Sequence, residues 1–591
     1  MKCLRLTCTL SVLLLFFALS SFGQTVNATL LGTVTDITGG VIANAKVSIT
    51  EVNTGVSRSG QTNESGNYTF PNLAPGQYAV SVEAAGFKKE TRKDIDVIVN
   101  SSTRVDLQLQ PGAVSESIEV TGAPPLLQTD RADTGMKIEM AQVMNMPLGT
   151  NRNFQVLLNM VPGTTMATFQ HSQFFNASSS LQTEVNGQMR MGNSYQIEGI
   201  DDNERTGLLQ MLVPPIEAIQ TVDVSTSNFE AELGRASGAN VNVQLKSGTN
   251  DFHGAAYEFF QNTKLDARSF FNPTVGAVHY NYFGGNVGGP IKKNKLFIFG
   301  DYLKIKDHEA NTNLVTVPSM QFRGGDLSSA PTPIYDPASG AQDGTGTGRT
   351  LFANNQIPAS RINTVSTKIL GLVPAPNQPF TLSNPSNNYY ATLPFSKDTD
   401  SFDVKIDDNL SERNRLSGRF SFSRPVVYQA PLFGLAGGPG PSTAFMGTGT
   451  QKTYSSGINF DRVFTNTLVA EFRIGASHYH NDATNSDYGT PAATNIGIVG
   501  ANVDQWSSGM SWININGGVT NPMVGYSPSL PWKRAEAIFN VVNTWTKTSG
   551  NHTIKWGVDL RRLRDDLLQT QTYSPRGRFE FDVAQTTTPG A

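Results

Sequence analysis

Cysteine is nearly absent from this chain of 591 residues, which contains only Cys3 and Cys8. Both lie in an N-terminal segment where Lys2 and Arg5 precede the apolar run LSVLLLFFALS, and the small residues of SFGQ follow. This pattern predicts a secretory signal peptide over residues 1–23. The exported chain would then contain no thiol, which excludes disulfides and cysteine chemistry and argues against a lipid anchor on cysteine.

Long apolar runs and catalytic motifs are also lacking. No later segment approaches the roughly 20 apolar residues of a membrane-spanning helix, so any membrane crossing has to use strands. The net charge of -3 gives no attraction to nucleic acid, which we do not expect as a partner. Because no glycine-rich phosphate loop and no serine, histidine and acid trio stands in a recognisable context, we expect neither enzyme activity nor a cofactor.

The residues that are abundant favour strands and turns. The chain has 55 glycines, its 33 phenylalanines outnumber every other aromatic residue, and 38% of its residues are hydrophobic. This composition suits many short strands better than helices. A chain of this length divides into roughly three or four units. We therefore expect a mainly β protein of several domains.

The first unit after the signal peptide covers residues 24–112. Short strand-like stretches such as AKVSITEV and GQYAVSVEAAGF alternate with Gly, Pro and Asn turns, as in a small antiparallel sandwich. Gly66 and Gly76 are expected at tight turns with positive φ, with Tyr68, Phe70 and Tyr78 packing a core beyond them. The pattern GTVTDITGGVIANAKVSI with TNESGNYTFPNLAPGQYAVSVEAAGF resembles the carboxypeptidase regulatory-like domain, a transthyretin-like sandwich. That resemblance implies a scaffold or adaptor, with ligand binding as the alternative.

A second unit is expected over residues 113–250. It contains a helical-looking IEMAQVMNMP and the passage IEAIQTVDVSTSNFEAELGRASGANVNVQLKSGTN. This passage resembles the end of the plug domain of TonB-dependent outer-membrane receptors. In that comparison Ile216 and Glu217 open a strand, a turn stands at Glu232, Leu233 and Gly234, and a last strand includes Gly238, Asn240, Val241, Asn242 and Val243. Ala239 stands where a second glycine is common.

A short segment before the plug, SESIEVTG, resembles the part of such receptors that TonB binds as an added edge strand. The alternative is a plain linking strand. The candidate TonB contacts are Glu116, Ser117, Ile118, Glu119, Val120 and Thr121.

Residues 251–591 read as paired strands with alternating faces. Phe402, Val404 and Ile406 alternate with Asp403, Lys405 and Asp407, and Leu468, Phe472 and Ile474 alternate with Glu471 and Arg473. Short turns join every second strand, whereas long connections run from Lys306 to Thr399, from Arg424 to Thr450 and from Asn481 to Arg534. Short turns at one end and long loops at the other are typical of an outer-membrane barrel.

The two faces of such a strand can be assigned in the stretch NHTIKWGVDLRR. In a soluble sandwich its apolar face would be the core, whereas in a barrel that face meets lipid. We expect the apolar residues, Ile554, Trp556, Val558 and Leu560, to face lipid. We expect Lys555, Asp559 and Arg561 to face the lumen.

Several stretches, among them NYFGGNVGGPIKKNKLFIFGDYLKIK and NNQIPASRINTVSTKIL, resemble the Oar-like barrel of TonB-dependent receptors. That family implies about 22 strands around a plug. Alternation indicates only about ten here, including GRFEFDV near the end, so we expect an incomplete, truncated barrel.

Two clusters could bind metal. His478 and His480 share a strand face with Asp482 nearby, and the alternative is that they lie at the outer rim without binding a metal. Glu198, Asp201, Asp202 and Glu204 could attract a hard cation, although a solvated plug loop fits their spacing better. Neither cluster leads us to expect a bound metal.

The sequence thus predicts a TonB-dependent receptor in the outer membrane, with its first domain in the periplasm. Its expected partners are the TonB complex, outer-membrane lipid and an extracellular substrate, which is a glycan, a peptide or a metal chelate. An adhesion or secretion-linked barrel without transport is the alternative, and a secreted adhesin built of several sandwiches is a third.

Overall fold

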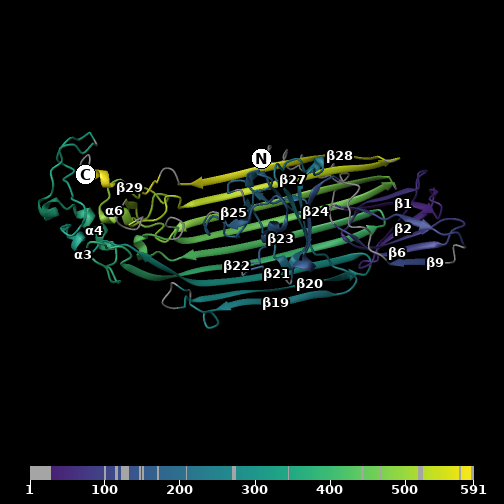
Figure 1. Cartoon of the computed structure of the whole chain (residues 1–591), viewed down its shortest axis with the longest axis horizontal. Helices are drawn as coiled ribbons and strands as arrows, with labels where there is room; N and C mark the ends of the chain where they lie inside the picture. The colour runs from purple at the N-terminus through teal and green to yellow at the C-terminus, as the bar shows by residue number, and fades with distance from the viewer. Residues whose placement is uncertain are drawn as a thin grey trace, which may run out of the picture.

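The computed structural model describes residues 28–98, 101–112, 117–121, 132–144, 148–149, 152–169, 172–207, 209–268, 270, 275–343, 345–440, 445–465, 467–516, 523–550, 552–570 and 574–587. The predicted signal peptide lies outside these ranges. Figure 1 shows three parts along the long axis: a small β domain at one end, a long sheet with a second domain against it, and a loop region at the other end. No helix within the described ranges is long and apolar enough to span a membrane.

The N-terminal domain is a sandwich of two sheets. One has the order β4–β1–β7 with β8 also paired to β1, and the other has the order β3–β2–β5–β6–β9. Tyr68, Phe70 and Tyr78 are buried in its core as predicted. Gly66 has the expected positive φ, but Gly76 does not, because it opens a strand and is not in a turn. The strands are β1 (Ala28–Asp36), β2 (Lys46–Glu51), β3 (Ser57–Gln61), β4 (Asn67–Leu73), β5 (Gly76–Glu83), β6 (Lys89–Val97), β7 (Ser102–Arg104), β8 (Leu107–Leu109) and β9 (Ser117–Thr121).

The second domain, which we call the plug, is built on a five-stranded sheet in the order β10–β17–β18–β13–β14. Its core packs one face of this sheet against a short 3-10 helix, η1 (Phe154–Met160). Its strands are β10 (Thr134–Glu139), β11 (Thr168–Phe169), β12 (Leu181–Gln182), β13 (Ser194–Ile197), β14 (Ile200–Asp201), β15 (Asn203–Glu204), β16 (Leu209–Gln210), β17 (Ile219–Ser227) and β18 (Asn240–Leu245).

One local expectation for the plug is confirmed in part and another was wrong. The helical-looking stretch includes the helix α2 (Met140–Val143), but Ile138 and Glu139 complete strand β10 and pair with β17. Residues 145–147 of this stretch lie outside the described residues. Ile216 and Glu217 do not open a strand. They form the 3-10 turn η3 (Ile216–Ala218), and β17 begins after it. The turn expected at Glu232 is η4 (Ala231–Leu233).

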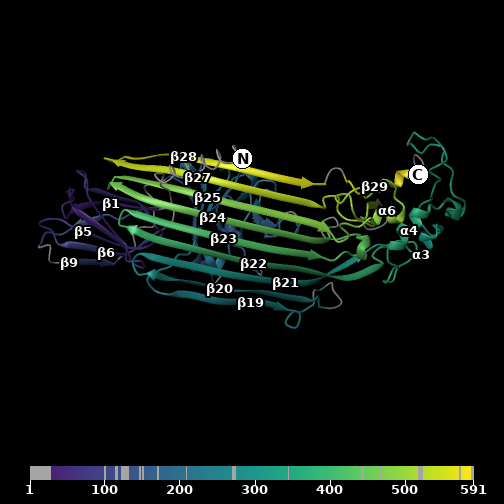
Figure 2. The same ribbon diagram turned by 180° about the vertical axis from the view of Figure 1, so that it is seen from behind.

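The long sheet, which we call the wall, contains nine antiparallel strands in chain order. They are β19 (His253–Asn262), β20 (Val278–Lys292), β21 (Leu296–Val315), β22 (Tyr389–Ser411), β23 (Asn414–Gln429), β24 (Gly447–Thr465), β25 (Leu468–Asn485), β27 (Trp532–Ser549) and β28 (His552–Gln569). The predicted fold class, with a sandwich, a plug and an incomplete antiparallel barrel, is therefore confirmed. Figure 2, seen from behind, shows the same meander from β19 to β28.

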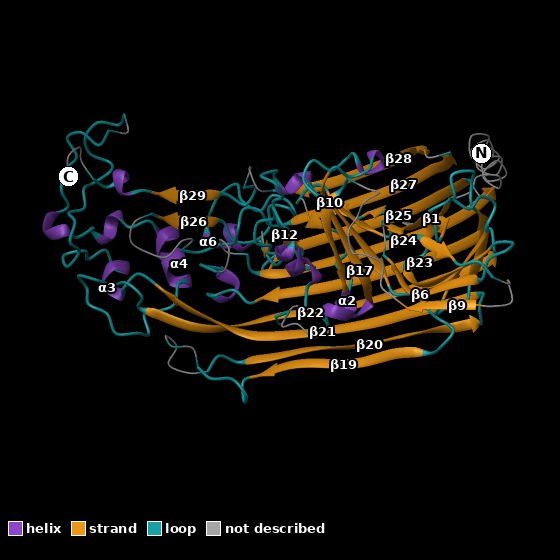
Figure 3. Ribbon diagram, turned by 45° about the vertical axis from the view of Figure 1, so that its right-hand side comes forward, coloured by secondary structure: helices purple, strands orange, loops and turns teal. Residues whose placement is uncertain are grey.

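The tenth predicted strand does not belong to the wall. GRFEFDV forms β29 (Arg578–Phe581), which pairs in parallel with β26 (Trp512–Ile515) in the loop region. Both lie with α3 (Met320–Arg323), α4 (Thr364–Leu372) and α6 (Ala492–Ile496) at the end of the molecule opposite the sandwich (Figure 3). The long connections share a hydrophobic core that includes Trp512, Met523 and Tyr526.

The predicted alternation of short and long connections is confirmed. The long ones are shorter than expected, covering residues 316–388, 430–446 and 486–531, because the strands extend further; β22, for example, has 23 residues. A strand that only crosses a bilayer needs about 9 to 11. The strands therefore continue beyond the membrane and carry the loops outward.

Candidate functional site: the interface between plug and wall

The acidic plug segment 198–204 enters the interface between plug and wall. Glu198, Asp201, Asp202 and Glu204 are all buried, so the solvated loop that we expected is wrong. Their partners are mostly basic side chains of the wall, which the sequence spacing could not indicate. Lys405 pairs with Glu198, and Arg534 pairs with Glu204. Asp201 pairs with Arg561 of the wall and with Arg205 of the plug. Among the described residues, no group of three or more metal-ligating side chains occurs.

Arg534 of β27 is the most enclosed of these cations. Its Nη2 lies 2.9 Å from Oε1 of Glu204 and donates to the hydroxyl of Tyr479 at 2.8 Å. Its guanidinium carbon lies 3.8 Å from the ring centre of Phe175 in the plug. Arg534 therefore contacts the plug both through charge and through a cation–π contact.

Asp201 is fully buried and lies close to cations of both the plug and the wall. Arg561 of β28 lies 2.9 Å from it, and Arg205 and Arg235 of the plug also face it. A buried carboxylate without such partners would be costly. Of these three cations only Arg561 belongs to the wall, so Asp201 keeps this partner only while the plug is docked.

Asp202 has a different environment. Its Oδ1 accepts a hydrogen bond from the backbone N–H of Leu212 at 3.2 Å. Burial raises the pKa of the Asp202 carboxyl well above its ordinary value. This carboxyl therefore favours its protonated form in the docked plug more than it would in water.

The backbone of this segment approaches the wall closely at three glycines. Arg473 donates from Nη1 to the carbonyl of Gly199 at 2.5 Å, and Gly199 has a φ of +71°. The next residue, Ile200, packs against Gly457 and Gly475, which are register partners on β24 and β25. A Cβ atom on Gly475 would lie 2.5 Å from Cγ2 of Ile200. The glycine pair thus forms a recess that accepts one plug side chain.

The predicted lumen face of β28 is confirmed where its side chains contact the plug. On the lumen side Lys555 pairs with Glu230 and Glu232 of the plug, and Arg561 with Asp201. The residues expected to face lipid, Ile554, Trp556, Val558 and Leu560, alternate with these along the strand and are exposed, as is most of β28. In β22 the alternation also holds, since Asp403, Lys405 and Asp407 are buried.

An aromatic cluster joins the plug to the loop end of the wall. Phe175 of the plug meets Trp532 edge to face at 5.5 Å, and Phe445 lies 5.8 Å from Trp532. Trp532 donates from Nε1 to Asn481 at 2.6 Å, and Asn481 in turn donates to the carbonyl of Phe174 at 3.1 Å. The plug and the loop end of the wall are therefore in direct contact.

The histidine pair lies outside this interface. The rings of His478 and His480 stack 6.5 Å apart, and His480 contacts Asp482 at 2.8 Å. Their neighbours Tyr479 and Asn481 are buried on the plug side, so the histidines point outward.

The candidate TonB segment lies far from this interface. Ser117–Thr121 form β9, which pairs in parallel with β6 of the sandwich. Glu116 lies outside the described residues. The role of the six residues in binding TonB stays a prediction.

The wall and its loops match a known protein family. Residues 244–591 match the model of the outer membrane beta barrel domain, which is more than half of the chain. The chain belongs to the outer-membrane β-barrel family. The protein is accordingly located in the outer membrane. Residues 29–110 of this barrel protein match the carboxypeptidase regulatory-like domain, which confirms that resemblance.

One curated protein and several solved structures are similar to parts of this barrel protein. It is 27% identical over 304 residues to a TonB-dependent transporter, Oar, of Myxococcus xanthus, covering 49% of this chain and 27% of the relative. It thus spans about a quarter of that curated relative. The outer-membrane transporter YddB of Escherichia coli matches 72% of this chain and 48% of its own, with 11% identity and a TM-score of 0.42. The match to the siderophore receptor PirA of Acinetobacter baumannii covers 73% of this chain and 57% of PirA, with 14% identity and a TM-score of 0.33.

Proposed function

We propose that this protein is a TonB-dependent receptor that binds an extracellular substrate and imports it with energy supplied through TonB. The observation that carries the proposal is the plug, which is held in the wall by separable ion pairs such as Arg534–Glu204 and Arg561–Asp201. A plug held by discrete charged contacts can be displaced as a unit without unfolding the wall. The similarity to the transporter Oar supports the same function.

This proposal assigns a different function to each end of the molecule. The long loops bind the substrate, which is a glycan, a peptide or a metal chelate. The sandwich, proposed for residues 24–112, lies at the short-turn end, where the periplasm would be. The plug is proposed for residues 113–250 and the barrel for 251–591. TonB adds as a strand to the segment that includes Val120. The chain acts as a receptor and not as an enzyme.

Binding of TonB to this segment can be measured with the full chain purified from outer membranes and the periplasmic domain of TonB. Val120→Pro removes a backbone donor from the segment, and we expect it to abolish binding. Gly60→Pro makes the same change in β3, at the other edge of the same sheet, and should bind normally. Equal binding by both variants and the unchanged chain would contradict the proposed contact.

Import is tested with labelled glycans, peptides and metal chelates offered to cells that have or lack TonB. The proposal expects uptake of one class only in cells with TonB. An adhesion or secretion-linked barrel would bind its ligand at the surface equally in both strains and accumulate none.

A further inference from the structure

A row of aromatic side chains crosses the outward face of the wall. Its rings belong to register partners on the adjacent strands β22 to β25, and successive ring centres lie 5.2 to 6.4 Å apart: Phe402, Phe422, Tyr454 and His478. Thr453 donates to the carbonyl of Met211 in the plug at 3.0 Å, so its neighbour Tyr454 points away from the plug. These residues, which we call the aromatic row, therefore face outward.

A second aromatic group lies near the short turns. Phe464 of β24 stacks on Trp545 of β27 at 5.3 Å, and Trp545 stacks on Trp556 of β28 at 6.3 Å. Tyr454 and Phe464, both on β24, are ten positions apart. At about 3.3 Å per residue and a tilt of about 40°, this separation spans roughly 25 Å along the membrane normal, which is the height of the apolar band of an outer-membrane barrel. Because the long loops lie beyond Tyr454, the aromatic row marks the outer surface of that band.

Basic side chains form the next row toward the long loops. The register of β23 with β24 on either side of this point places Arg424 opposite Lys452. Lys452 is in turn the register partner of His480 on β25. Arg424 and Lys452 are exposed, and each stands two positions beyond a residue of the aromatic row, Phe422 and Tyr454. We call Arg424, Lys452 and His480 the basic row.

Carboxylates lie at the two ends of the basic row. Asp400 of β22 is the register partner of Arg424, but it also pairs with Lys304 at 2.8 Å. At the other end Asp482 pairs with His480 at 2.8 Å. Both carboxylates therefore already contact a basic side chain, and the middle of the basic row keeps a net positive charge.

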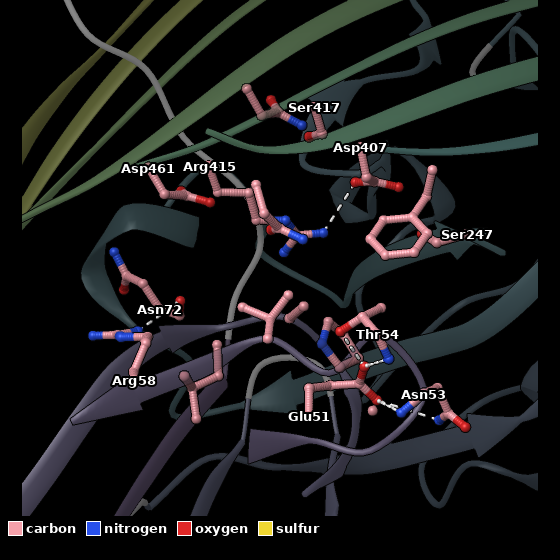
Figure 4. Close-up of a pocket in the computed structure, with 18 of the residues that line it drawn as sticks. Glu51, Asn53, Thr54, Arg58, Asn72, Ser247, Asp407, Arg415, Ser417 and Asp461 are labelled. Carbon is pink, nitrogen blue, oxygen red and sulfur yellow. Dashed lines mark hydrogen bonds and ion pairs between the residues drawn. The ribbon is translucent and has the colours of Figure 1, made fainter. Parts of the chain in front are cut away.

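The lumen face of the same strand is arranged differently. There Arg415 of β23 pairs with Asp407 of β22 at 3.0 Å, in the cavity between the sandwich and the wall (Figure 4). On the outward face Arg424 of β23 stands opposite a lysine instead. Like charges directly opposite each other on one face of a sheet are destabilising. An anion between Arg424 and Lys452 would remove this cost.

We infer that the basic row binds the phosphate of a lipid headgroup in the outer leaflet. Its position just beyond the apolar band is the depth at which lipid headgroups surround a barrel. Arginine offers a planar fork of donors that matches phosphate, and lysine adds a point charge. The aromatic row below them contacts the apolar part of the same lipid. The inference goes beyond the proposed function, because it holds whether the barrel transports a substrate or only binds one.

The test uses the full chain purified in detergent and lipid A, a glycolipid with phosphate groups on its sugars. Labelled lipid A is titrated onto the immobilised protein in mixed micelles. We expect R424Q/K452Q to bind lipid A at least about tenfold more weakly than the unchanged chain, since two charge-assisted contacts are lost. Dephosphorylated lipid A should bind both proteins with the same, lower affinity. Inorganic phosphate should not displace lipid A, because it makes no contact with the aromatic row.

Two further variants serve as controls. R462Q/K547Q removes one arginine and one lysine from the same wall near the short turns and should bind lipid A normally. R424K/K452R keeps both charges and should bind within about threefold of the unchanged chain. Without lipid A, R424Q/K452Q should unfold in urea no earlier than the unchanged chain, because a pair of like charges has been removed.

Four results would overturn the inference. The first is equal binding of lipid A by R424Q/K452Q and the unchanged chain. The second is an equal loss in R462Q/K547Q, which would show a general attraction of charge. The third is full displacement by inorganic phosphate, which would show a site for free anions. The fourth is earlier unfolding of R424Q/K452Q without lipid A, which would show that these two side chains stabilise the wall by themselves.

Discussion

Arg534 and Glu204 form an ion pair between wall and plug in which each side chain is only 1% exposed. Such a pair contributes little net stability when both partners are present, because desolvation opposes the attraction. Losing one partner is costly, since the other charge is then left buried. The pair therefore makes docking of the plug sensitive to a change at either residue.

Glu204→Gln should weaken docking of the plug by about 3 to 5 kcal/mol, because Arg534 stays buried without its carboxylate. The docked fraction can be followed in urea by thiol labelling of a cysteine placed at Ser225, which is 2% exposed on β17. Adding Arg534→Met to Glu204→Gln removes the stranded charge and should recover part of the loss. A double variant as unstable as the single one would contradict this account.

Lys555→Ala should cost less than about 1 kcal/mol in the same urea titration. Like Arg534 and Glu204, Lys555 and Glu232 form an ion pair between wall and plug, at 3.0 Å. The lysine side chain, however, is 41% exposed and screened by solvent. The small loss should also shrink in high salt, whereas that of Glu204→Gln should not. A loss equal to that of Glu204→Gln would show that exposure does not control these contacts.

The alternation of apolar and polar residues was sufficient to predict the wall, because a strand between lipid and lumen separates them residue by residue. Lys555 and Trp556 were correctly placed on opposite faces for this reason. The same rule placed GRFEFDV in the wall, since alternation cannot distinguish a wall strand from β29 in the loop region.

The partners of the plug's acidic segment were not predictable. Glu204 and Arg534 are 330 positions apart, and only the fold brings them together. The spacing within the acidic segment therefore indicated a solvated loop or a bound cation. The partners of its carboxylates are instead arginine and lysine side chains of the wall. Glycine inside strands was an available signal for close approach, and Gly457 and Gly475 could have indicated where the plug docks.

Gly475→Val should weaken docking of the plug, because its side chain would occupy the space of Ile200. Overpacking of this kind costs about 1 to 3 kcal/mol. The same urea titration measures it. Adding Ile200→Ala should relieve the clash and restore part of the stability. If Gly475→Val leaves the docking of the plug unchanged in this titration, the recess is not required for docking.

Stability of the loop region should depend on pH through Asp487. Its Oδ2 accepts a hydrogen bond from the N–H of Met510 at 2.6 Å, but burial raises the pKa of its carboxyl above the ordinary value. A raised pKa favours the protonated folded form. The contribution is therefore fully present below the unfolded pKa of about 3.9 and is lost as pH rises through the folded pKa. Thermal proteolysis of the loop region across this range should show the decline, and Asp487→Asn should flatten it.

Trp556→Arg tests the assignment of lipid and lumen faces. Trp556 is 49% exposed on the outer face of β28, where bilayer would cover it. An arginine on the lipid face costs about 2 to 4 kcal/mol near the midplane. We therefore expect less folded protein in outer-membrane fractions and a lower midpoint when it is unfolded from lipid vesicles. Thr553→Arg changes the adjacent, lumen-facing row of the same strand and should have little effect. Because both variants add one arginine to β28, a difference between them reports the environment of the face and not the propensity of the strand. Equal losses would mean that the two faces do not meet different surroundings, and the membrane assignment of β28 would then be wrong.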